Sequence, residues 1–522
     1  MDLFANPGLP KSRRIVSIWL PRLPTDRLSR KNSAAPDKPL VVSIKNDNAL
    51  RIYATDRRAA RLGLKTGMPL ADARAMIPVL EVIEADHPGD HALLEKIADW
   101  CDRFTPLVAL DSPHGLFLDV TGVEHLFGGE AALCETIRAK IAAQGFAVQC
   151  ALAGTSAAAR ALAHYAPGTI ALPGKEDEAI ADLPVAALQL DGAIAHGLRR
   201  AGLKTIGQVA ARARNELTAR FGKAMVAHLD HALGRTEEPV SPLRPLPDFM
   251  AEHRFAEPVM TQEVILASLQ NLAETLGEVL ERHGQGAREM TAVFFRADGA
   301  VRRLGVQTGA PTREAAIITR LFRERLDSLA DPLDAGFGFD LIRLEASCAQ
   351  RQAEETPDFA ADAQAEKEVA FLVDRLAARF GAQRVLRFQQ QDTHIPEAAC
   401  VATPAQYATP AKAPWQMHRA DKDAPQRPIR LLARPEPIEA PLALAPDSPP
   451  KRFRWRHVQH TVAHAEGPER IAMEWWRHQE PRLTRDYYRV EDEEGRRFWI
   501  YRDGLYDREI AAPQWYVHGV FA

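Results

Sequence analysis

Short apolar runs alternate with amphipathic helical stretches through the first third of the chain. Apolar runs bounded by turn residues are typical of buried strands, whereas apolar positions that recur every three or four residues indicate helices. The predicted strands are 14–20, 39–44, 146–154 and a pair within 107–122 that is joined by a tight Ser-Pro-His-Gly turn. The predicted helices are two pieces within 56–78, then 90–104, 129–144 and 156–166. This alternation favours α/β character.

The pattern becomes mainly helical from residue 178, with glycines between the short helices. A strand–helix–strand–strand–helix–strand order follows. Its first helix, 262–282, carries leucines on one stripe, and 289–308 predicts a hairpin that turns at Asp298-Gly299. A second helix at 312–326 and a strand at 337–347 complete this predicted α+β segment.

The last part of the chain changes in composition twice. Proline and alanine dominate residues 393–450 and periodicity is weak there, which is typical in part of a linker. Five of the eight tryptophans and five of the eight tyrosines lie after residue 450, so we predict a small aromatic-rich β module. Within it, 486–504 predicts a hairpin whose turn is Glu-Asp-Glu-Glu-Gly.

Length and composition narrow the class of protein. A chain of 522 residues exceeds one ordinary hydrophobic core, so several domains are expected. No apolar run approaches twenty residues, and the N-terminal residues lack the basic-then-apolar order of a signal peptide. Five scattered cysteines without metal-ligand spacing favour reduced thiols and a cytoplasmic location. The net charge of −3 gives no sign of nucleic-acid binding by the molecule as a whole, so any such binding would depend on local basic clusters. Each of these clusters is also typical of a solvated face.

Several segments together resemble the Y family of translesion DNA polymerases. They are the first strand, YATDRRAARLGLKTGMPLADARAMIP (53–78), LDSPHGLFLDVTG (110–122), LRRAGLKTIGQV (198–209) and FGKAMVAHLDHALGRTEEPV (221–240). They occur in the order of the family and, with the strand–helix order that follows, cover residues 14–390. Further segments resemble the C-terminal region of ImuB proteins, which are Y-family relatives from bacterial mutagenesis cassettes. These are RPIRLLARPEPIEA, RFRWRH, GPERIAMEWWR, RDYYRVEDEEGRRFWIYRDG and WYVHGVFA.

This resemblance implies a multidomain α/β and α+β fold. We expect the right hand of a Y-family polymerase, with palm, fingers, thumb and little finger, plus a small aromatic-rich C-terminal module. The expected domains are the palm at 1–20 and 80–172, the fingers at 21–79, a helical thumb with a helix-hairpin-helix at 173–248, the little finger at 249–392, a linker at 393–425 and an ImuB-type interaction module at 426–522.

The resemblance also locates the position of the family's active site. Polymerases hold two divalent ions about 3.5–4 Å apart, and such hard cations need carboxylate ligands. The first-strand aspartate of the family aligns with Trp19, and the Asp-Glu pair of its palm hairpin aligns with His114 and Gly115. All three acidic positions are therefore replaced. We expect no catalytic residue, no metal ion and no other cofactor.

Other carboxylates lie nearby in the sequence, namely Asp26, Asp111 and Asp119, but no arrangement apparent from the sequence gathers three of them. The expected fingers also lack the family's nucleotide contacts, because its nucleotide-binding tyrosine and arginine align with Arg57 and Ala60. The alternative is an active error-prone polymerase that binds Mg²⁺ through displaced ligands.

Two regions are candidates for DNA binding. The thumb segment AGLKTIGQ offers backbone N–H groups at a helix start, which can bind phosphate without reading sequence, although capping in an ordinary helical thumb explains it equally. The candidate residues there are Gly202, Lys204, Thr205 and Gly207. In the little finger, Arg302 and Arg303 are adjacent in a strand, so one of them faces away from the helices. That sheet face is a candidate for salt-sensitive contact with the DNA backbone, or a solvated edge.

Candidate partner segments come from the resemblance. Y-family proteins dock on the ring-shaped β sliding clamp through a short peptide that has a glutamine, then aliphatic residues, then an aromatic residue. The best match is QRQAEETPDFA (350–360), with Gln352 and Phe359, although it lacks a central leucine. The C-terminal module is expected to recruit an ImuA-type RecA-like protein and a C-family error-prone polymerase. Its Trp475-Trp476 and Tyr487-Tyr488 pairs are candidate anchors or core residues.

These features together predict a non-catalytic adaptor in DNA-damage-induced translesion synthesis and mutagenesis. It would bind primer-template DNA without sequence preference, bind the sliding clamp and recruit an error-prone polymerase. Two alternatives stay open: an active Y-family nucleotidyltransferase, and an interaction scaffold without DNA affinity.

Overall fold

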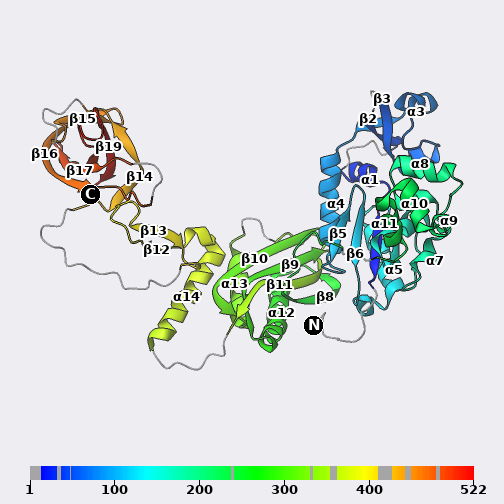
Figure 1. The fold of residues 1–522 in the computed structure, drawn as a ribbon. Coiled ribbons are helices and arrows are strands. Elements are labelled where there is room, and N and C mark those ends of the chain that lie inside the picture. The colour runs from blue at the N-terminus through cyan, green and yellow to red at the C-terminus, as the bar shows by residue number, and fades with distance from the viewer. Residues whose placement is uncertain are drawn as a thin grey trace. The chain divides into compact units, whose positions relative to one another are not determined.

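The computed structural model describes most of the chain (Figure 1). The described ranges are 13–31, 37–46, 49–236, 240–329, 333–352, 361–408, 426–440, 448–477 and 482–521. The chain divides into two compact units, Met1–Arg379 and Phe380–Ala522. Within the described ranges, every helix is too short or too polar to cross a lipid bilayer.

The first sheet of the N-terminal unit has the strand order β5-β6-β1-β7, and all of its pairings are antiparallel. Its elements are β1 (Ile15–Trp19), β5 (Val108–Asp111), β6 (Gly115–Asp119) and β7 (Gln149–Ala153), with helices α4 (His87–Cys101), α5 (Glu130–Ala143) and α6 (Ser156–Tyr165). Alternation along β1 directs Ile15 and Trp19 toward the core beneath α6, whereas Val16 and Ile18 join the core beneath α4 and α5. The central strand is therefore covered on both faces.

The residues between β1 and β5 form a smaller three-stranded sheet, of order β3-β2-β4. Its strands are β2 (Leu40–Asn46), β3 (Ala49–Thr55) and β4 (Glu81–Glu84), and α1 (Leu23–Arg30), α2 (Arg57–Arg61) and α3 (Leu70–Met76) accompany them. Val41, Ile52, Leu64 and Leu70 form its compact core. This sheet corresponds to the segment that resembles the fingers.

Short helices follow, as the glycine-punctuated pattern predicts. They are α7 (Glu176–Ile180), α8 (Gly192–Arg200), α9 (Ile206–Ala210), α10 (Arg214–Phe221) and α11 (Lys223–Ala232). Leu198, Ile206, Val209 and Leu229 from these helices enter the same hydrophobic core as the alanines of α6. The helical segment is therefore packed directly against the first sheet.

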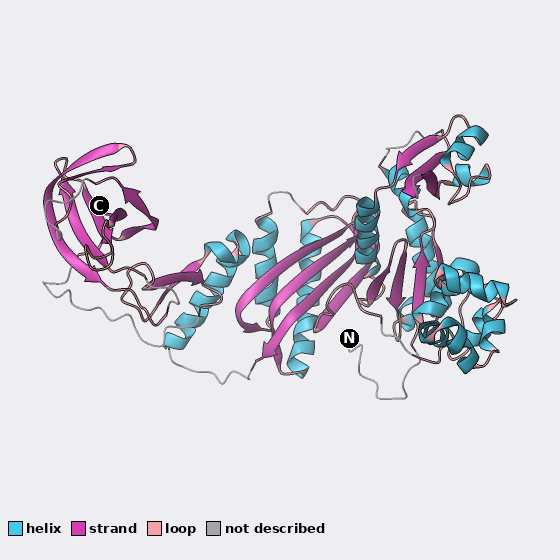
Figure 2. Ribbon diagram, turned by 45° about the horizontal axis from the view of Figure 1, so that its top comes forward, coloured by secondary structure: helices cyan, strands magenta, loops and turns pink. Residues whose placement is uncertain are grey.

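The second large sheet has the order β10-β9-β11-β8 and long antiparallel strands (Figure 2). Its elements are β8 (Phe249–Val259), α12 (Gln262–Arg282), β9 (Gln285–Arg296), β10 (Val301–Thr312), α13 (Ala315–Asp327) and β11 (Phe339–Arg351), and α14 (Ala361–Phe380) follows. The predicted leucine stripe of α12 is buried against the sheet, and the β9–β10 hairpin turns at the predicted Asp298-Gly299. Gly299 has a φ of +95°, which explains the glycine at the turn.

The C-terminal unit begins with a short antiparallel pair, β12 (Leu386–Gln390) and β13 (Cys400–Pro404), after the single turn η3 (Ala382–Arg384). The sequence pattern assigned 249–392 to the little finger and 393–425 to a linker. In the structure, β13 lies inside that predicted linker and β12 joins the C-terminal unit. The two strands satisfy each other's backbone groups by pairing, which the weak alternation of this segment did not predict.

The aromatic-rich module is a closed antiparallel barrel. Its strands, in the order β14-β19-β18-β17-β16-β15, are β14 (Arg430–Ile438), β15 (Arg452–Trp455), β16 (Val458–Ile471), β17 (Arg485–Asp492), β18 (Arg497–Asp503) and β19 (Gln514–Val520). Glu439, just after β14, and Arg454 on β15 exchange backbone hydrogen bonds of 3.1 and 2.8 Å, which closes the ends of the sheet. Closure removes the free sheet edges that would otherwise pair with other chains.

The two aromatic pairs, which the sequence left as candidate anchors or core residues, differ in burial. Tyr487 and Tyr488 are each 1% exposed, so they are core residues. Trp475 and Trp476, which follow β16, are 79% and 59% exposed, and their rings meet edge to face at 5.7 Å. Two large aromatic side chains left in water are available to a partner.

Candidate functional site

The three positions expected to replace the palm carboxylates lie together at one end of the first sheet. Trp19 is the last residue of β1 and pairs with Gly115 on β6 and Gln149 on β7. The carbonyl oxygen of His114 accepts a hydrogen bond from the Leu20 N–H at 2.8 Å. The side chains at this end of the sheet therefore decide whether a metal pair can bind.

The Trp19 side chain, at the end of β1, stacks on a second ring. Its indole lies parallel to the imidazole of His164 on α6, with ring centres 4.0 Å apart and planes inclined by 15°. Burial disfavours the imidazolium and Arg160 repels it, which lowers the pKa of His164 to about 4. His164 is therefore neutral near pH 7. The two rings therefore stack face to face without a charge between them.

His114 is held by the fingers. Its Nε2 lies 3.2 Å from the hydroxyl oxygen of Tyr53 on β3, and the Tyr53 ring also meets His87 edge to face at 4.9 Å. Burial lowers the pKa of His114, although the Asp90 carboxylate acts in the opposite direction. A neutral imidazole that is hydrogen-bonded to a tyrosine is a poor ligand for a hard cation such as Mg²⁺.

The remaining carboxylates are each bound to other groups. Asp111 Oδ1 lies 3.3 Å from Nη1 of Arg160, and burial raises the pKa of Asp111 against the effect of that arginine. Asp119 Oδ1 accepts hydrogen bonds from the Thr121 N–H and hydroxyl at 3.1 and 2.6 Å. Asp26 accepts a backbone N–H at 2.8 Å.

The hairpin turn leaves little room for a larger residue at position 115. A Cβ on Gly115 would lie 3.0 Å from both the carbonyl oxygen and Oδ2 of Asp111. Within the described ranges, no three histidine, cysteine, aspartate or glutamate side chains gather closely enough to hold a metal ion. The residues present therefore do not fit the pair of Mg²⁺ ions that the resemblance implies.

The predicted phosphate site of the thumb has most of its N–H groups engaged within the protein. The side chain of Gln208 accepts hydrogen bonds from the N–H groups of Lys204 and Thr205 at 2.8 and 3.4 Å, and Thr205 caps α9 in return. The Gly207 N–H donates to a carbonyl oxygen of the preceding segment at 2.8 Å. Gly202 is exposed with a φ of +78°, and the Lys204 side chain is exposed.

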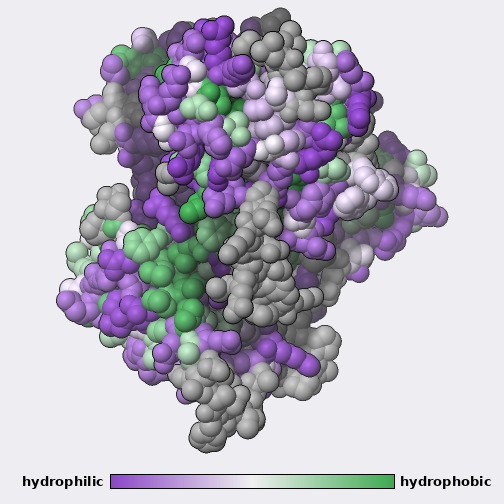
Figure 3. All heavy atoms as spheres, turned by 90° about the vertical axis from the view of Figure 1, so that its left-hand side faces the viewer, coloured by the Kyte–Doolittle hydropathy of each residue, from purple (hydrophilic) through white to green (hydrophobic). Residues whose placement is uncertain are grey.

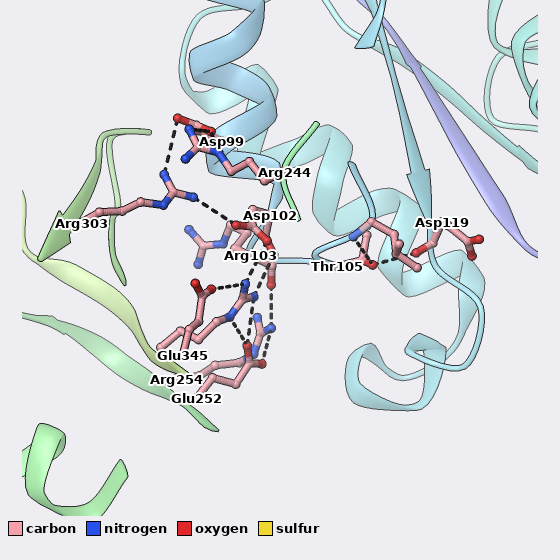
Figure 4. A network of polar contacts seen from close by, with 12 residues as sticks. Asp99, Asp102, Arg103, Thr105, Asp119, Arg244, Glu252, Arg254, Arg303 and Glu345 are labelled. Atoms are coloured by element: carbon pink, nitrogen blue, oxygen red, sulfur yellow. Dashed lines mark hydrogen bonds and ion pairs between the residues drawn. The ribbon is translucent and has the colours of Figure 1, made fainter. Parts of the chain in front are cut away.

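The two arginines of the second sheet point in different directions. Arg303 faces away from the helices, and its guanidinium lies 3.2 Å from Asp102 and 3.5 Å from Asp99 of the α4 region (Figure 4). Arg302 lies on the opposite side of the strand, where it is exposed and 3.9 Å from Asp334. In this conformation the Arg303 charge is balanced by protein carboxylates.

Arg303 belongs to a larger group, the α4 charge cluster, which joins the first sheet's helix to the second sheet (Figure 4). Its members are Asp99, Asp102, Arg103, Arg244, Glu252, Arg254, Arg303, Asp340, Arg343 and Glu345. Arg303, Val293, Arg343 and Glu252 form one cross-strand row on the sheet face that meets α4. Asp102 and Arg343 were not singled out from the sequence, because their contact spans 241 positions.

The predicted clamp-binding segment is only partly described. The Gln352 N–H donates to the Gly284 carbonyl oxygen at 3.1 Å, and the side chain is half-buried beside Gly286. Phe359 lies outside the described residues. Gln352 is therefore tied to the end of the second sheet.

Comparison with known proteins places the chain in a family. Residues 27–164 match the impB/mucB/samB family, and residues 247–355 match the C-terminal domain of that family. Protein ImuB of Caulobacter vibrioides (strain NA1000 / CB15N) is 41% identical over 469 residues, covering 88% of this chain and 100% of the relative. The chain belongs to the ImuB family. It is thus a Y-family-like protein related to DNA damage, which confirms the predicted right-hand fold class with an aromatic-rich C-terminal module.

This ImuB-family chain is also similar to named polymerases. DNA polymerase IV of Dehalococcoides mccartyi (strain CBDB1) is 28% identical over 270 residues, which cover 50% of this chain and 68% of that protein. Among solved structures, the post-insertion binary complex of Dbh DNA polymerase is 17% identical, with a TM-score of 0.39 over 64% of this chain and 98% of that chain. DinB from Sulfolobus solfataricus is 18% identical, with a TM-score of 0.37 and the same coverage.

Proposed function

We propose that this ImuB-family protein is a non-catalytic adaptor of translesion DNA synthesis in the bacterial cytoplasm. It binds primer-template DNA without sequence preference, docks on the β sliding clamp, and recruits a C-family error-prone polymerase and an ImuA-type RecA-like protein. The observation that carries the proposal is the stack of Trp19 on His164, since Trp19 is the residue that the resemblance aligns with the family's first-strand aspartate. Neither ring supplies the oxygen ligands that Mg²⁺ requires.

The recruiting role draws on the C-terminal unit. Its barrel is closed, so partner binding by strand addition at an open barrel edge is disfavoured. Trp475 and Trp476 are instead exposed beside a compact core, which is the arrangement of interface anchors. We propose that these two side chains contact the recruited polymerase or its RecA-like companion.

Primer extension beside DNA binding tests the adaptor function. Full-length protein is incubated with primer-template, nucleoside triphosphates and either Mg²⁺ or Mn²⁺, and affinity for the same DNA is measured by fluorescence anisotropy over a range of salt concentrations. The proposal predicts salt-dependent binding without extension. Extension that is lost in an Asp111→Ala/Asp119→Ala variant would reject it. Failure to bind DNA at low salt would favour a scaffold that works through proteins alone.

The similarity to DNA polymerase IV supports a second candidate, an active polymerase with displaced ligands. It requires Asp111 to leave Arg160 and Asp119 to leave Thr121 when DNA and nucleotide bind. The same extension assay separates the two candidates, because only an active polymerase depends on these carboxylates.

A further inference from the structure

One end of the C-terminal barrel holds a cavity of about 500 Å³. Its wall comes from β15, the start of β16, the start of β18 and the end of β19. Ligand pockets typically measure roughly 300–1,000 Å³, and the mouth of a β-barrel is one of their usual places. The lining is mainly apolar, whereas the molecular face drawn in Figure 3 is mainly hydrophilic, with apolar side chains gathered in one patch. Apolar surface that is open to water favours a ligand that covers it.

Rings make up much of the cavity wall. Trp455, Phe498 and Phe521 contribute aromatic side chains, and His460 contributes an imidazole. The Trp455 indole is fixed in place, because its Nε1–H donates to Glu436 Oε2 at 2.8 Å and its ring meets Phe498 edge to face at 5.7 Å. Fixed rings gain most from contact with another flat ring, so the wall favours a planar ligand over a flexible one.

His460 gives this wall one polar group in a defined protonation state. The side chain is 4% exposed, and its Nδ1 lies 2.9 Å from Asp492 Oδ2. Burial raises the pKa of Asp492, but the hydrogen bonds from His460 and Arg496 bring it down to about 2, so near pH 7 this group is a carboxylate that only accepts. Nδ1 therefore carries a proton, and in the neutral ring Nε2 is an acceptor. A ligand with an N–H or O–H group can donate to it.

Three arginines give the mouth of the cavity a positive charge. Arg456, Arg496 and Arg497 line it, and in the part of the chain that the structure describes no acidic side chain does so. The carboxylate partners of Arg456 and Arg497, which are Glu436 and Glu491, lie outside the lining. These two arginines are 60% and 53% exposed, and exposed ion pairs contribute little. An anionic group in the cavity can therefore compete for them.

We propose that this cavity binds a nucleotide, with the base against the rings and the phosphate at the arginines. A nucleotide combines the three features that the wall selects, namely a flat ring, an N–H donor and an anionic group. An alkyl carboxylate would satisfy the arginines and the apolar wall but would leave Nε2 of His460 without a donor. The same chemistry is present in a free nucleotide and in single-stranded DNA, whose bases stack on aromatic side chains with little regard to sequence.

Calorimetric titration of full-length protein with deoxyadenosine monophosphate, in buffer without divalent cations, tests the proposal. Val458→Glu places a carboxylate on the cavity wall at a position that is 48% exposed, and Arg456→Ala/Arg497→Ala removes two of its positive charges. Arg434→Ala/Arg452→Ala is the matched control, because both arginines are exposed barrel residues outside this lining. We expect at least about tenfold weaker binding in both cavity variants and wild-type binding in the control.

A second titration, with a single-stranded oligonucleotide of five deoxyadenosines, distinguishes the source of the ligand. Binding that is tighter than that of the mononucleotide and is reduced in both cavity variants would assign the cavity to a base of single-stranded DNA. Oligonucleotide binding that the cavity variants leave unchanged, beside loss of mononucleotide binding, would assign it to a free nucleotide. Both results support the proposal.

Other results would overturn it. Wild-type protein that binds neither probe contradicts the proposal, and so does binding that the cavity variants leave intact. Equal loss in the control variant would show a general attraction of anions to the barrel surface. Dodecanoate that binds more tightly than the mononucleotide and displaces it would assign the cavity to an alkyl carboxylate. Circular dichroism should match wild type in every variant, and either cavity variant alone decides the test if the other melts early.

Discussion

Replacement of Arg343 by methionine should loosen the contact between α4 and the second sheet. The Arg343 side chain is 2% exposed. Its guanidinium lies 2.9 Å from Asp102 Oδ1, 2.8 Å from the Asp102 carbonyl oxygen and 3.2 Å from Glu252 Oε2. Methionine fills much of the same volume but leaves these oxygens without their buried cation.

The size of the effect follows from what remains around each carboxylate. Removing one member of a buried ion pair typically costs about 3–5 kcal/mol. Asp102 keeps Arg303 at 3.2 Å and Glu252 keeps Arg254 at 3.0 Å, so we expect the lower end, about 3 kcal/mol. Burial already raises the pKa of Glu345 while Arg343 opposes that rise. Loss of Arg343 raises this pKa further, so the variant should recover part of its stability as the pH falls and Glu345 binds a proton.

Hydrogen exchange measures this contact without assuming that the whole chain unfolds in one step. Amides of 98–105 and 339–347 should exchange about 100-fold faster in Arg343→Met, since about 1.4 kcal/mol corresponds to a factor of ten. Arg375→Met is the matched control: its guanidinium lies 2.6 Å from Glu324, but the side chain is 32% exposed, so the expected loss is below about 1 kcal/mol. Unchanged protection in Arg343→Met would refute the claim that the α4 charge cluster holds the sheet.

Three further predictions concern the sheet end and the C-terminal unit. Gly115→Ala should destabilise the first sheet by about 1–3 kcal/mol, measured as faster hydrogen exchange of amides 108–119, because its Cβ would crowd Asp111 at 3.0 Å; wild-type exchange rates would contradict this packing. NMR should find His164 half-protonated near pH 4, and because this folded-state pKa lies below the ordinary 6.5, stability should fall as the pH drops from 6.5 through about 4. Trp19→Ala should raise that pKa by admitting water; an unchanged value would exclude the stack as its cause. Trp475→Ala/Trp476→Ala should leave thermal stability unchanged and weaken co-purification of the error-prone polymerase or of the RecA-like protein at least about tenfold, whereas full recovery of both partners would assign recruitment to other residues.

Much of the fold follows from periodicity alone. The leucine stripe predicted α12 at its observed bounds, and Asp-Gly between two alternating runs predicted the β9–β10 turn, where Gly299 has a positive φ. Both signals are local. The strand pair β12–β13 was missed because its residues carry little alternation, and it forms through pairing between segments on either side of a turn region. The barrel closure at Glu439 and Arg454 likewise has no local signature.

The candidate site was predictable in position but not in its contacts. The order of motifs brought Trp19, His114 and Gly115 to one end of a sheet, and the structure places them there. The partners of these residues, His164 and Tyr53, were not predicted because they come from other elements. Side-chain charge alone also could not show that carboxylates of the α4 region engage Arg303, since one sequence does not reveal contacts two hundred positions apart.

Among the described residues, the sheet end around Trp19 offers no ligand set for two divalent cations. Electron paramagnetic resonance of Mn²⁺, titrated into full-length protein with primer-template and a non-hydrolysable nucleoside triphosphate, tests it most directly. If no cation binds there, the spectrum should equal that of the same mixture without protein. Two protein-bound Mn²⁺ ions per chain, both lost in an Asp111→Ala/Asp119→Ala variant, would contradict it.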